Sequence, residues 1–321
     1  MIVITGGTGF IGSHLLKRLV TEGESVRALT RRSGEARQGA PSVEWQQVDF
    51  SNPSQLGRAL EGAHALIHLA GVTKALRATD YYEGNVLASQ AMARAVSGRD
   101  LRFVHVSSLA AIGPSPDCVP IGEDAEPHPI THYGKSKLEA ERAVRGLVPE
   151  AVIVRPPVVY GPRDTDVFQL LKSISKGLVL EIAGGDRWFN AIYVEDLVEG
   201  ILAAARSGRA PGRAYFLTHA KAYTWGDLAA AAARIMGRSP RVLRVPVPVA
   251  RGVGLFTELW SRITGTPGIV SREKIDEAVC KCWTCDHRRA AEELGFRAST
   301  TLEEGLAKAL VWYKEAGWLA Y

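Results

Sequence analysis

A tyrosine and a lysine stand four residues apart, Tyr133 and Lys137, in the stretch Tyr-Gly-Lys-Ser-Lys. The stretch opens a helical pattern, and residues four apart share one face of a helix. A phenol has an unperturbed pKa of about 10, and a nearby ammonium group favours its ionised form. The pair could therefore serve general acid–base catalysis, with an exposed helix pair as the plainer alternative.

Two hydroxyl residues, Ser107 and Ser108, end an apolar run in the same half of the chain. If the run is a buried strand, these hydroxyls lie at the carboxyl edge of a sheet, where ligands bind in open α/β folds. Ser108 could then donate a hydrogen bond to a substrate carbonyl oxygen or alkoxide. The alternative is that the serine only caps the strand.

A glycine-rich loop, Thr-Gly-Gly-Thr-Gly-Phe-Ile-Gly at residues 5–12, lies between the first predicted strand and the first predicted helix. Its glycines allow a sharp turn and a close approach to a pyrophosphate, and the helix N-terminus offers free N–H groups. In this position the loop indicates a dinucleotide site, whereas the same glycines elsewhere would predict only a turn.

The second predicted strand ends at Thr30 and is followed by Arg31 and Arg32, with no carboxylate at that point. A carboxylate there usually holds the ribose 2′-hydroxyl of NAD. Guanidinium groups instead suit bidentate capture of a phosphate. We therefore expect NADP as the cofactor, with NAD as the alternative if both arginines belong only to a solvated loop.

Short β-like runs alternate with amphipathic stretches through the first half of the chain, which favours a parallel sheet with helices on both faces. The runs are rich in Val, Ile and Leu, as strands buried on both faces should be. The predicted strands cover residues 2–5, 25–30, 43–48, 65–69, 102–107 and 151–155, and the predicted helices cover 11–22, 82–96 and 133–145. The expected fold class is α/β, a Rossmann-type doubly wound parallel sheet.

The pattern changes after residue 160, where strands are predicted over 192–194 and 215–218 and helices over 167–176, 196–206, 225–236 and the C-terminal region. We expect residues 1–160 to form an NAD(P)-binding domain to which 191–219 return. Residues 161–190 and 220–321 are expected to form a smaller, mostly helical substrate lobe. An apolar, proline-punctuated region at 242–263 is expected to pack as core and lid, with a segment lying on a membrane as the alternative.

Composition and charge restrict the kinds of binding partner that we expect. The net charge of +5 comes from scattered basic residues, so we expect no nucleic-acid partner. No apolar run reaches the roughly 18 residues that a membrane span needs. The first predicted strand starts at the first residue, which leaves no room for a signal peptide. We expect a cytoplasmic protein with a small-molecule substrate and leave a homodimer open.

Three of the four cysteines, Cys280, Cys282 and Cys285, cluster ahead of a predicted helix at 288–294. Structural zinc sites use two separated ligand pairs, and the sequence offers one group, so no metal is expected. Disulfides are rare in cytosolic proteins. We therefore expect free thiols in this cluster.

Taken together, these motifs make the chain resemble the extended short-chain dehydrogenase/reductases, also called the NAD-dependent epimerase/dehydratase family. Further matches are HLAG at 68–71, Asn85, RPPVVYGP at 155–162, YVEDL at 193–197 and LGF at 294–296, followed by a helix ending in WYKEAGWL. The order and spacing of the motifs hold through nearly the whole chain.

The resemblance implies that Tyr133 is the acid–base residue and that Lys137 binds the nicotinamide ribose and lowers the tyrosine pKa. Ser108 matches the family's catalytic Ser/Thr, and Asp49 matches the residue that accepts a hydrogen bond from the adenine amino group. The full expected cofactor-binding set is Gly6, Gly9, Phe10, Ile11, Gly12, Arg31, Arg32, Asp49, Phe50, Leu69, Ala70, Gly71, Asn85, Ser107, Tyr133, Lys137 and Pro156.

Several positions depart from the family's sugar-nucleotide members. Leu109 and Ala110 stand where the 4,6-dehydratases carry Asp-Glu, so dehydration is not expected. Val158 and Phe189, expected at the substrate, stand where an Asn and an Arg bind the diphosphate, although Arg187 could substitute. The segment RPPVVYGP at 155–162 and the apolar region at 242–263 resemble instead those relatives that reduce flavonol-like or steroid-like ketones.

The leading hypothesis is hydride transfer between NAD(P)(H) and a secondary alcohol or ketone at a Ser-Tyr-Lys site. Epimerisation of a nucleotide sugar at the same site, without net redox change, is the first alternative. A non-enzymatic dinucleotide sensor is the second, and the presence of Ser108, Tyr133 and Lys137 argues against it because a sensor does not need them.

Overall fold

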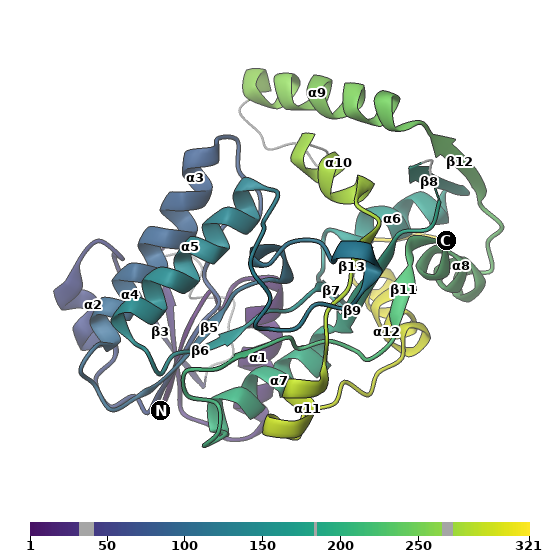
Figure 1. Ribbon diagram of the computed structural model, residues 1–321. Helices are drawn as coiled ribbons and strands as arrows, with labels where there is room; N and C mark the ends of the chain where they lie inside the picture. Colours follow the sequence, from purple (N-terminus) through teal and green to yellow (C-terminus); the bar gives the residue numbers. More distant parts are fainter. Residues whose placement is uncertain (32–41, 183–184, 265–271) are drawn as a thin grey trace.

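A seven-stranded parallel sheet forms the centre of the molecule (Figure 1). The computed structural model describes residues 1–31, 42–182, 185–264 and 272–321. The strand order is β10-β6-β5-β4-β1-β2-β3, which is Rossmann-like, and the predicted fold class is confirmed. The strands are β1 (Ile2–Thr5), β2 (Val26–Thr30), β3 (Val43–Gln47), β4 (Ala65–His68), β5 (Arg102–Val106), β6 (Val152–Val154) and β10 (Ala214–Tyr215).

Helices cover both faces of this sheet because its strands are apolar on both sides. On one face, α1 (Phe10–Thr21) and α7 (Val194–Arg206) share a core with residues such as Leu15, Ile201 and Val104. On the other face lie α2 (Pro53–Ala59), α4 (Ala88–Val96) and α5 (His132–Leu147), packed around Leu56, Met92 and similar residues. Between β4 and α4, α3 (Ala78–Tyr82) continues into a π-helical turn, Glu83–Leu87, which sequence periodicity did not predict.

A second sheet belongs to the later part of the chain. Its central strand is β9 (Trp188–Tyr193), which pairs with β7 (Val158–Tyr160), β11 (Ala222–Thr224) and β13 (Cys282–Trp283). A separate apolar core joins this sheet to α6 (Val167–Ser175), α8 (Trp225–Met236) and α12 (Leu302–Glu315). Helix α11 (Arg288–Leu294) instead packs against α7.

Up to Thr257, where its described side chains end, the apolar region at 242–263 is largely exposed, whereas we expected it to pack as core and lid. It forms β12 (Arg241–Val245), paired with β8 (Leu178–Ile182), and then α9 (Val247–Thr264), which packs against α10 (Arg272–Val279). In Figure 1, α9 lies along the outside of the molecule, away from the central sheet. Gly254 of α9 is buried against α10, whereas the larger apolar side chains are exposed: Val249, Val253, Leu255 and Phe256, preceded by Val242 and Leu243 on β12.

The cysteine cluster also differs from the expectation of free thiols. Cys282, on β13, forms a disulfide with Cys118, which lies 164 residues earlier in the chain. Cys280 and Cys285 are free. The bridge ties the segment between Ser108 and Tyr133 to the second sheet. The sequence could not reveal this pairing because it depends on the tertiary fold.

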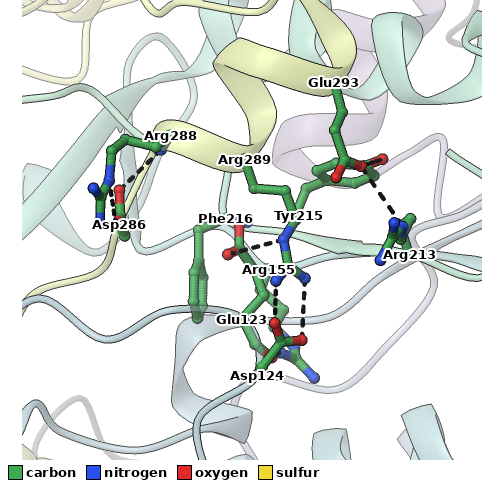
Figure 2. A network of polar contacts seen from close by, with 10 residues as sticks. All are labelled: Glu123, Asp124, Arg155, Arg213, Tyr215, Phe216, Asp286, Arg288, Arg289 and Glu293. Carbon is green, nitrogen blue, oxygen red and sulfur yellow. Dashed lines mark hydrogen bonds and ion pairs between the residues drawn. The ribbon is translucent and has the colours of Figure 1, made fainter. Parts of the chain in front are cut away.

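A buried polar network joins the central sheet to distant segments (Figure 2). Arg155, directly after β6, forms an ion pair with Glu141 of α5 at 2.6 Å, and both side chains are at most 5% exposed. The same guanidinium group donates to the Glu123 backbone carbonyl at 3.0 Å. The Glu123 carboxylate accepts from the backbone N–H of Phe216 at 3.1 Å and pairs with Arg289 of α11 at 3.5 Å. This network holds the ends of β6 and β10 in place.

Candidate active site

Tyr133 and Ser108 meet where the first turn of α5 crosses the segment after β5. Thr131 caps α5 by accepting a hydrogen bond from the N–H of Gly134 at 3.1 Å. Gly134 is needed because a Cβ there would lie 2.3 Å from the carbonyl oxygen of Ala110. This close approach brings the Tyr133 hydroxyl within hydrogen-bonding reach of the Ser108 hydroxyl.

Burial raises the pKa of Tyr133 to about 12, and the hydrogen bond with Ser108 only partly opposes that rise. The causes of this shift do not include Lys137, so its expected effect on the pKa of Tyr133 stays a prediction. The Lys137 ammonium group donates to the backbone carbonyl of Val106 at 2.7 Å instead. The phenol is therefore protonated at neutral pH, which suits a proton donor better than a base.

Lys137 is buried at the carboxyl edge of the sheet. Burial lowers its pKa to about 8, and the negative charge of Glu141 acts in the opposite direction. A Cβ placed on Gly71 would lie 3.8 Å from Lys137 Nζ and 2.8 Å from Asn85 Oδ1. The structure thus gathers three predicted residues, Lys137, Gly71 and Asn85, around one point.

Asn85 lies in the π-helical turn, and such turns occur frequently at functional sites. Its Oδ1 accepts from the N–H of Val72 at 2.7 Å, and its Nδ2 donates to the Val72 carbonyl at 3.0 Å. The same Nδ2 donates to the Ser136 hydroxyl at 2.9 Å. Asn85 therefore fixes the loop after β4 against the helix that carries Tyr133 and Lys137.

The glycine loop is built to bring backbone close to a ligand. Gly6 has φ +74°, and a Cβ there would lie 2.8 Å from the N–H nitrogen of Ala70. A Cβ on Gly12 would lie 2.1 Å from the carbonyl oxygen of Gly6. Helix α1 starts at Phe10 after Gly9, and no described side chain caps it, so its first N–H groups stay available to an anion.

A buried hydrogen-bond chain under this loop escaped sequence analysis. Thr5 Oγ1 lies 2.7 Å from His68 Nδ1 and accepts from the N–H of Ala70 at 3.1 Å. His68 Nε2 lies 3.1 Å from the Ser89 hydroxyl. Burial lowers the pKa of His68 to about 3, so the ring is neutral. His68 was visible in the HLAG motif, but only the fold shows that it braces the loop after β4.

A cavity of about 630 Å³ opens beside the ends of β2 and β3. Three predicted cofactor residues, Arg31, Asp49 and Phe50, line it together with Gln46, Gln47, Val48, Gln55 and Arg58. The Asp49 carboxylate accepts from the hydroxyl and the N–H of Ser51, which lowers its pKa. Arg58, on α2, was missed because α2 itself was not predicted. Arg32 lies outside the described residues.

Three other predicted residues lie at the same edge of the sheet. The Ser107 hydroxyl is buried and has no hydrogen-bond partner among the described residues. The Pro156 carbonyl accepts from the N–H of Leu109 at 2.9 Å, which holds the segment after Ser108 against the sheet. Leu69 is half-buried directly after β4.

The three predicted substrate residues are partly buried or already in contact with neighbouring groups. Val158 is half-buried on β7. Phe189 is only 2% exposed, because its ring stacks on Trp225 with centroids 4.2 Å apart. The Arg187 guanidinium group donates to the backbone carbonyls of Ile182 and Gly185 at 2.7 and 3.0 Å. Arg187 thus holds its own loop in shape.

Helix α10 lies over the start of α5. Glu273 accepts from the N–H of His132 at 2.8 Å, and Glu277 accepts from the Thr131 hydroxyl at 3.2 Å. Burial raises the pKa of Glu277. Both glutamates flank the turn that presents Tyr133, and the sequence gave no sign of their contact with it.

Comparison with known proteins identifies the family. The model of the NAD dependent epimerase/dehydratase family matches residues 2–217. The chain belongs to this family. It is 32% identical over 320 residues to a ceramide reductase of Caulobacter vibrioides, covering 99% of this chain and 96% of that one.

A second relative is the 4-hydroxy-2-methyl-3-oxo-4-farnesyl-3,4-dihydroquinoline-1-oxide ketoreductase of Stigmatella aurantiaca. It is 30% identical over 318 residues, covering 94% of this chain and 93% of that one. The crystal structure of UDP-glucuronic acid 4-epimerase from Bacillus cereus in complex with NAD superposes with a TM-score of 0.79 at 20% identity. That match covers 98% of this chain and 99% of the epimerase, and it supports the fold.

Proposed function

We propose that this family member is an NADP-dependent oxidoreductase that interconverts a ketone and a secondary alcohol on a molecule with a long hydrocarbon chain. The observation that carries the proposal is the protonated Tyr133 hydroxyl held against Ser108 beside a buried Lys137. The two relatives at 30% identity or more support the substrate class, because their names denote reductases of a ceramide and of a farnesyl-bearing ketone.

The residues present fit a dinucleotide. The glycine loop leaves no room for side chains at Gly6 and Gly12, and the uncapped start of α1 suits a pyrophosphate. The buried Ser107 hydroxyl offers a polar group that still lacks a partner among the described residues. Backbone groups of Ala70 and Gly71 would hold the cofactor between these points. When bound, the nicotinamide supplies or accepts the hydride.

The chain's own part in ketone reduction is to deliver one proton. As negative charge develops on the carbonyl oxygen, the Tyr133 hydroxyl donates its proton to that oxygen, and the product is the neutral alcohol. Ser108 donates a hydrogen bond to the same oxygen, which stabilises the developing charge. The Lys137 ammonium group, close to Gly71, favours the phenolate that remains and binds a ribose hydroxyl.

Two features argue against the sugar chemistry of other family members. Leu109 and Ala110 follow Ser108 and carry no group that can move a proton, so elimination of water lacks a catalyst. A diphosphate needs donors once it leaves water. Val158 offers none, and two backbone carbonyls accept from Nη1 of Arg187, which restrains its guanidinium group.

The preference for NADP rests on the cavity beside β2 and β3. Arg31 and Arg58 both line it, and no carboxylate follows the end of β2 directly. Two guanidinium groups at one cavity suit the 2′-phosphate that distinguishes NADP from NAD. Asp49 and Phe50 would contact the adenine from the same cavity.

The deciding experiment follows NADPH during incubation with ketones of increasing alkyl chain length. Reduction should consume one NADPH for each alcohol formed, and kcat/KM should rise with chain length because apolar surface is buried on binding. Epimerisation of a UDP-sugar, with no net loss of NADPH, is the competing outcome. If the protein interconverts UDP-sugars and reduces no ketone of the series, the oxidoreductase assignment is wrong.

A further inference from the structure

We propose that α9 lies flat on an anionic membrane surface and holds the active site beside the bilayer from which a lipid substrate is drawn. The inference rests on the proposed function for its substrate class. It concerns the apolar stripe, defined here as Val249, Val253, Leu255 and Phe256. None of the helices in the described ranges is both long and apolar enough to cross a bilayer.

The stripe faces away from the rest of the protein. Ala250 and Gly254, one turn apart on α9, are both buried, and a Cβ on Gly254 would lie 3.1 Å from the side chain of Ile275 on α10. Val249, Val253 and Phe256 recur at the spacing of a neighbouring helical face. Their exposed fractions are 54%, 48% and 67%. A helix that turns its small residues inward and its large apolar ones outward lacks a partner for its outer face.

Charge identifies the partner as an anionic surface. From Arg234 to Thr257 the sequence contains no Asp or Glu, and its basic residues are Arg234, Arg238, Arg241, Arg244 and Arg251. Arg244 pairs with Glu181 and Arg251 with Asp276, yet these two arginine side chains remain 77% and 57% exposed. An apolar helix face flanked by arginines is typical of helices that lie in the interface of anionic membranes. The long hydrocarbon chain proposed for the substrate agrees with this choice.

A single helix, α10, lies between the apolar stripe and the turn that carries Tyr133. Helix α10 contacts α9 on one side, and on another side its Glu273 and Glu277 bind the first turn of α5. Tyr133 belongs to that turn. Figure 1 shows α9 along the top of the molecule, with α10 below it, between α9 and the rest of the protein. A bilayer touching α9 would therefore lie one helix away from the catalytic turn.

The test is flotation of the full-length protein with vesicles of phosphatidylcholine and phosphatidylglycerol in equal parts, and with vesicles of phosphatidylcholine alone. We expect binding to the anionic vesicles. The double variant Val253→Ser/Phe256→Ser should lower the partition coefficient at least about tenfold. Arg241→Gln should lower it about fivefold on anionic vesicles and leave the neutral ones unaffected. Val311→Ser, at a 55% exposed valine of α12, is the matched control and should bind as the parent does.

Each outcome decides the proposal. The proposal is wrong if the parent protein does not bind anionic vesicles. It is also wrong if the Val253→Ser/Phe256→Ser variant, with an unchanged circular dichroism spectrum, binds them as strongly as the parent. If light scattering shows a dimer that this variant breaks, while vesicles are ignored, the stripe is a subunit contact and the proposal fails. Reduction of a short, water-soluble ketone is measured in parallel without vesicles. Its loss alone counts against the proposed function, and its retention without vesicle binding counts only against the membrane surface.

Discussion

At the scale of single residues, the candidate site combines a protonated phenol, Tyr133, with a lysine, Lys137, whose amine is a weaker base than usual. Burial raises the pKa of Tyr133 and lowers that of Lys137, so both groups are shifted towards their neutral forms. Negative charge that develops on a substrate carbonyl oxygen near both groups would raise the pKa of Lys137 again and favour its ammonium form. The environment thus favours proton donation at neutral pH, and it can be tested at Tyr133 and at Lys137.

Tyr133→Phe should fold and bind cofactor but reduce ketones about a hundred- to ten-thousandfold more slowly, because the proton donor is lost. Tyr81→Phe is a suitable control, since the Tyr81 ring lies 6.2 Å from that of Tyr133. It should keep nearly full activity. Single-turnover rates with saturating NADPH measure the chemical step directly. A Tyr133→Phe variant as fast as the Tyr81→Phe control would remove Tyr133 from the mechanism.

The pH dependence should report Lys137. Its pKa of about 8 means that the ammonium charge is complete below that pH and is lost as the pH rises through it. We expect kcat/KM for NADPH, which reflects the free enzyme, to fall above about pH 8 for this reason. Lys137→Arg should move this limb beyond the measured range, because a guanidinium group stays charged. If that variant keeps the same limb, another group is responsible.

Cofactor choice should depend on Arg31 and Arg58. Replacing either by Ala should weaken NADP binding about tenfold or more, since a charge-assisted hydrogen bond contributes about 1.5–3 kcal/mol. NAD binding should change little, because NAD lacks the phosphate. Calorimetry on Arg209→Ala, at an exposed arginine that does not line the cavity, provides the control. Equal loss of NAD and NADP affinity in the Arg31→Ala variant would contradict the proposed role.

At the scale of helices and strands, periodicity in the sequence predicted those elements that a local apolar pattern determines. The six strands of the first half and helices α1 and α5 lie within two residues of their predicted bounds, because buried strands and amphipathic helices carry their pattern in a few consecutive residues. Strands β8 and β12 were not predicted, since each is stabilised by a partner about 60 residues away. The short helix α2 was missed too, and with it Arg58 at the cavity.

The same reasoning separates the predictable part of the site from the rest. The glycine loop, Ser108, Tyr133 and Lys137 could be proposed for the site from the sequence because each belongs to a motif with fixed spacing. The contacts of Glu273 and Glu277 with the start of α5 join segments more than 140 residues apart. No local pattern encodes such a contact, because it depends on how two lobes pack.

Element positions also depend on the buried ion pair between Arg155 and Glu141. Removing one partner leaves an uncompensated buried charge, so Arg155→Met or Glu141→Gln should each lower the free energy of unfolding by about 3–5 kcal/mol. The exposed pair Arg206–Glu22 is the control, and its loss should cost about 1 kcal/mol or less. Urea unfolding measures both changes. Similar small losses for the two pairs would show that the buried Arg155–Glu141 pair contributes little to stability.

At the scale of the whole molecule, one covalent bond links regions that the sequence keeps far apart. The disulfide between Cys118 and Cys282 joins the segment that leads from Ser108 to Tyr133 with the strand next to β9. Non-covalent contacts reinforce this junction, since the Ser115 N–H donates to the Cys282 carbonyl at 2.9 Å and its hydroxyl lies 2.9 Å from that of Thr284. The segment between Ser108 and Tyr133 is therefore held to the second sheet at several points.

The double variant Cys118→Ser/Cys282→Ser should be less stable by about 2–4 kcal/mol, because the unfolded chain regains the freedom that a 164-residue loop closure removes. Dithiothreitol should lower the stability of the parent to a similar extent and leave the double variant unchanged. Cys280→Ser is the matched control, because Cys280 is a free cysteine two residues from the bridge. Thiol titration of the unfolded, unreduced parent should count two thiols, Cys280 and Cys285, and reduction should raise the count to the four cysteines of the sequence. Four reactive thiols before reduction would mean that the bridge is absent, and the junction would then depend on non-covalent contacts such as those of Ser115 and Thr284.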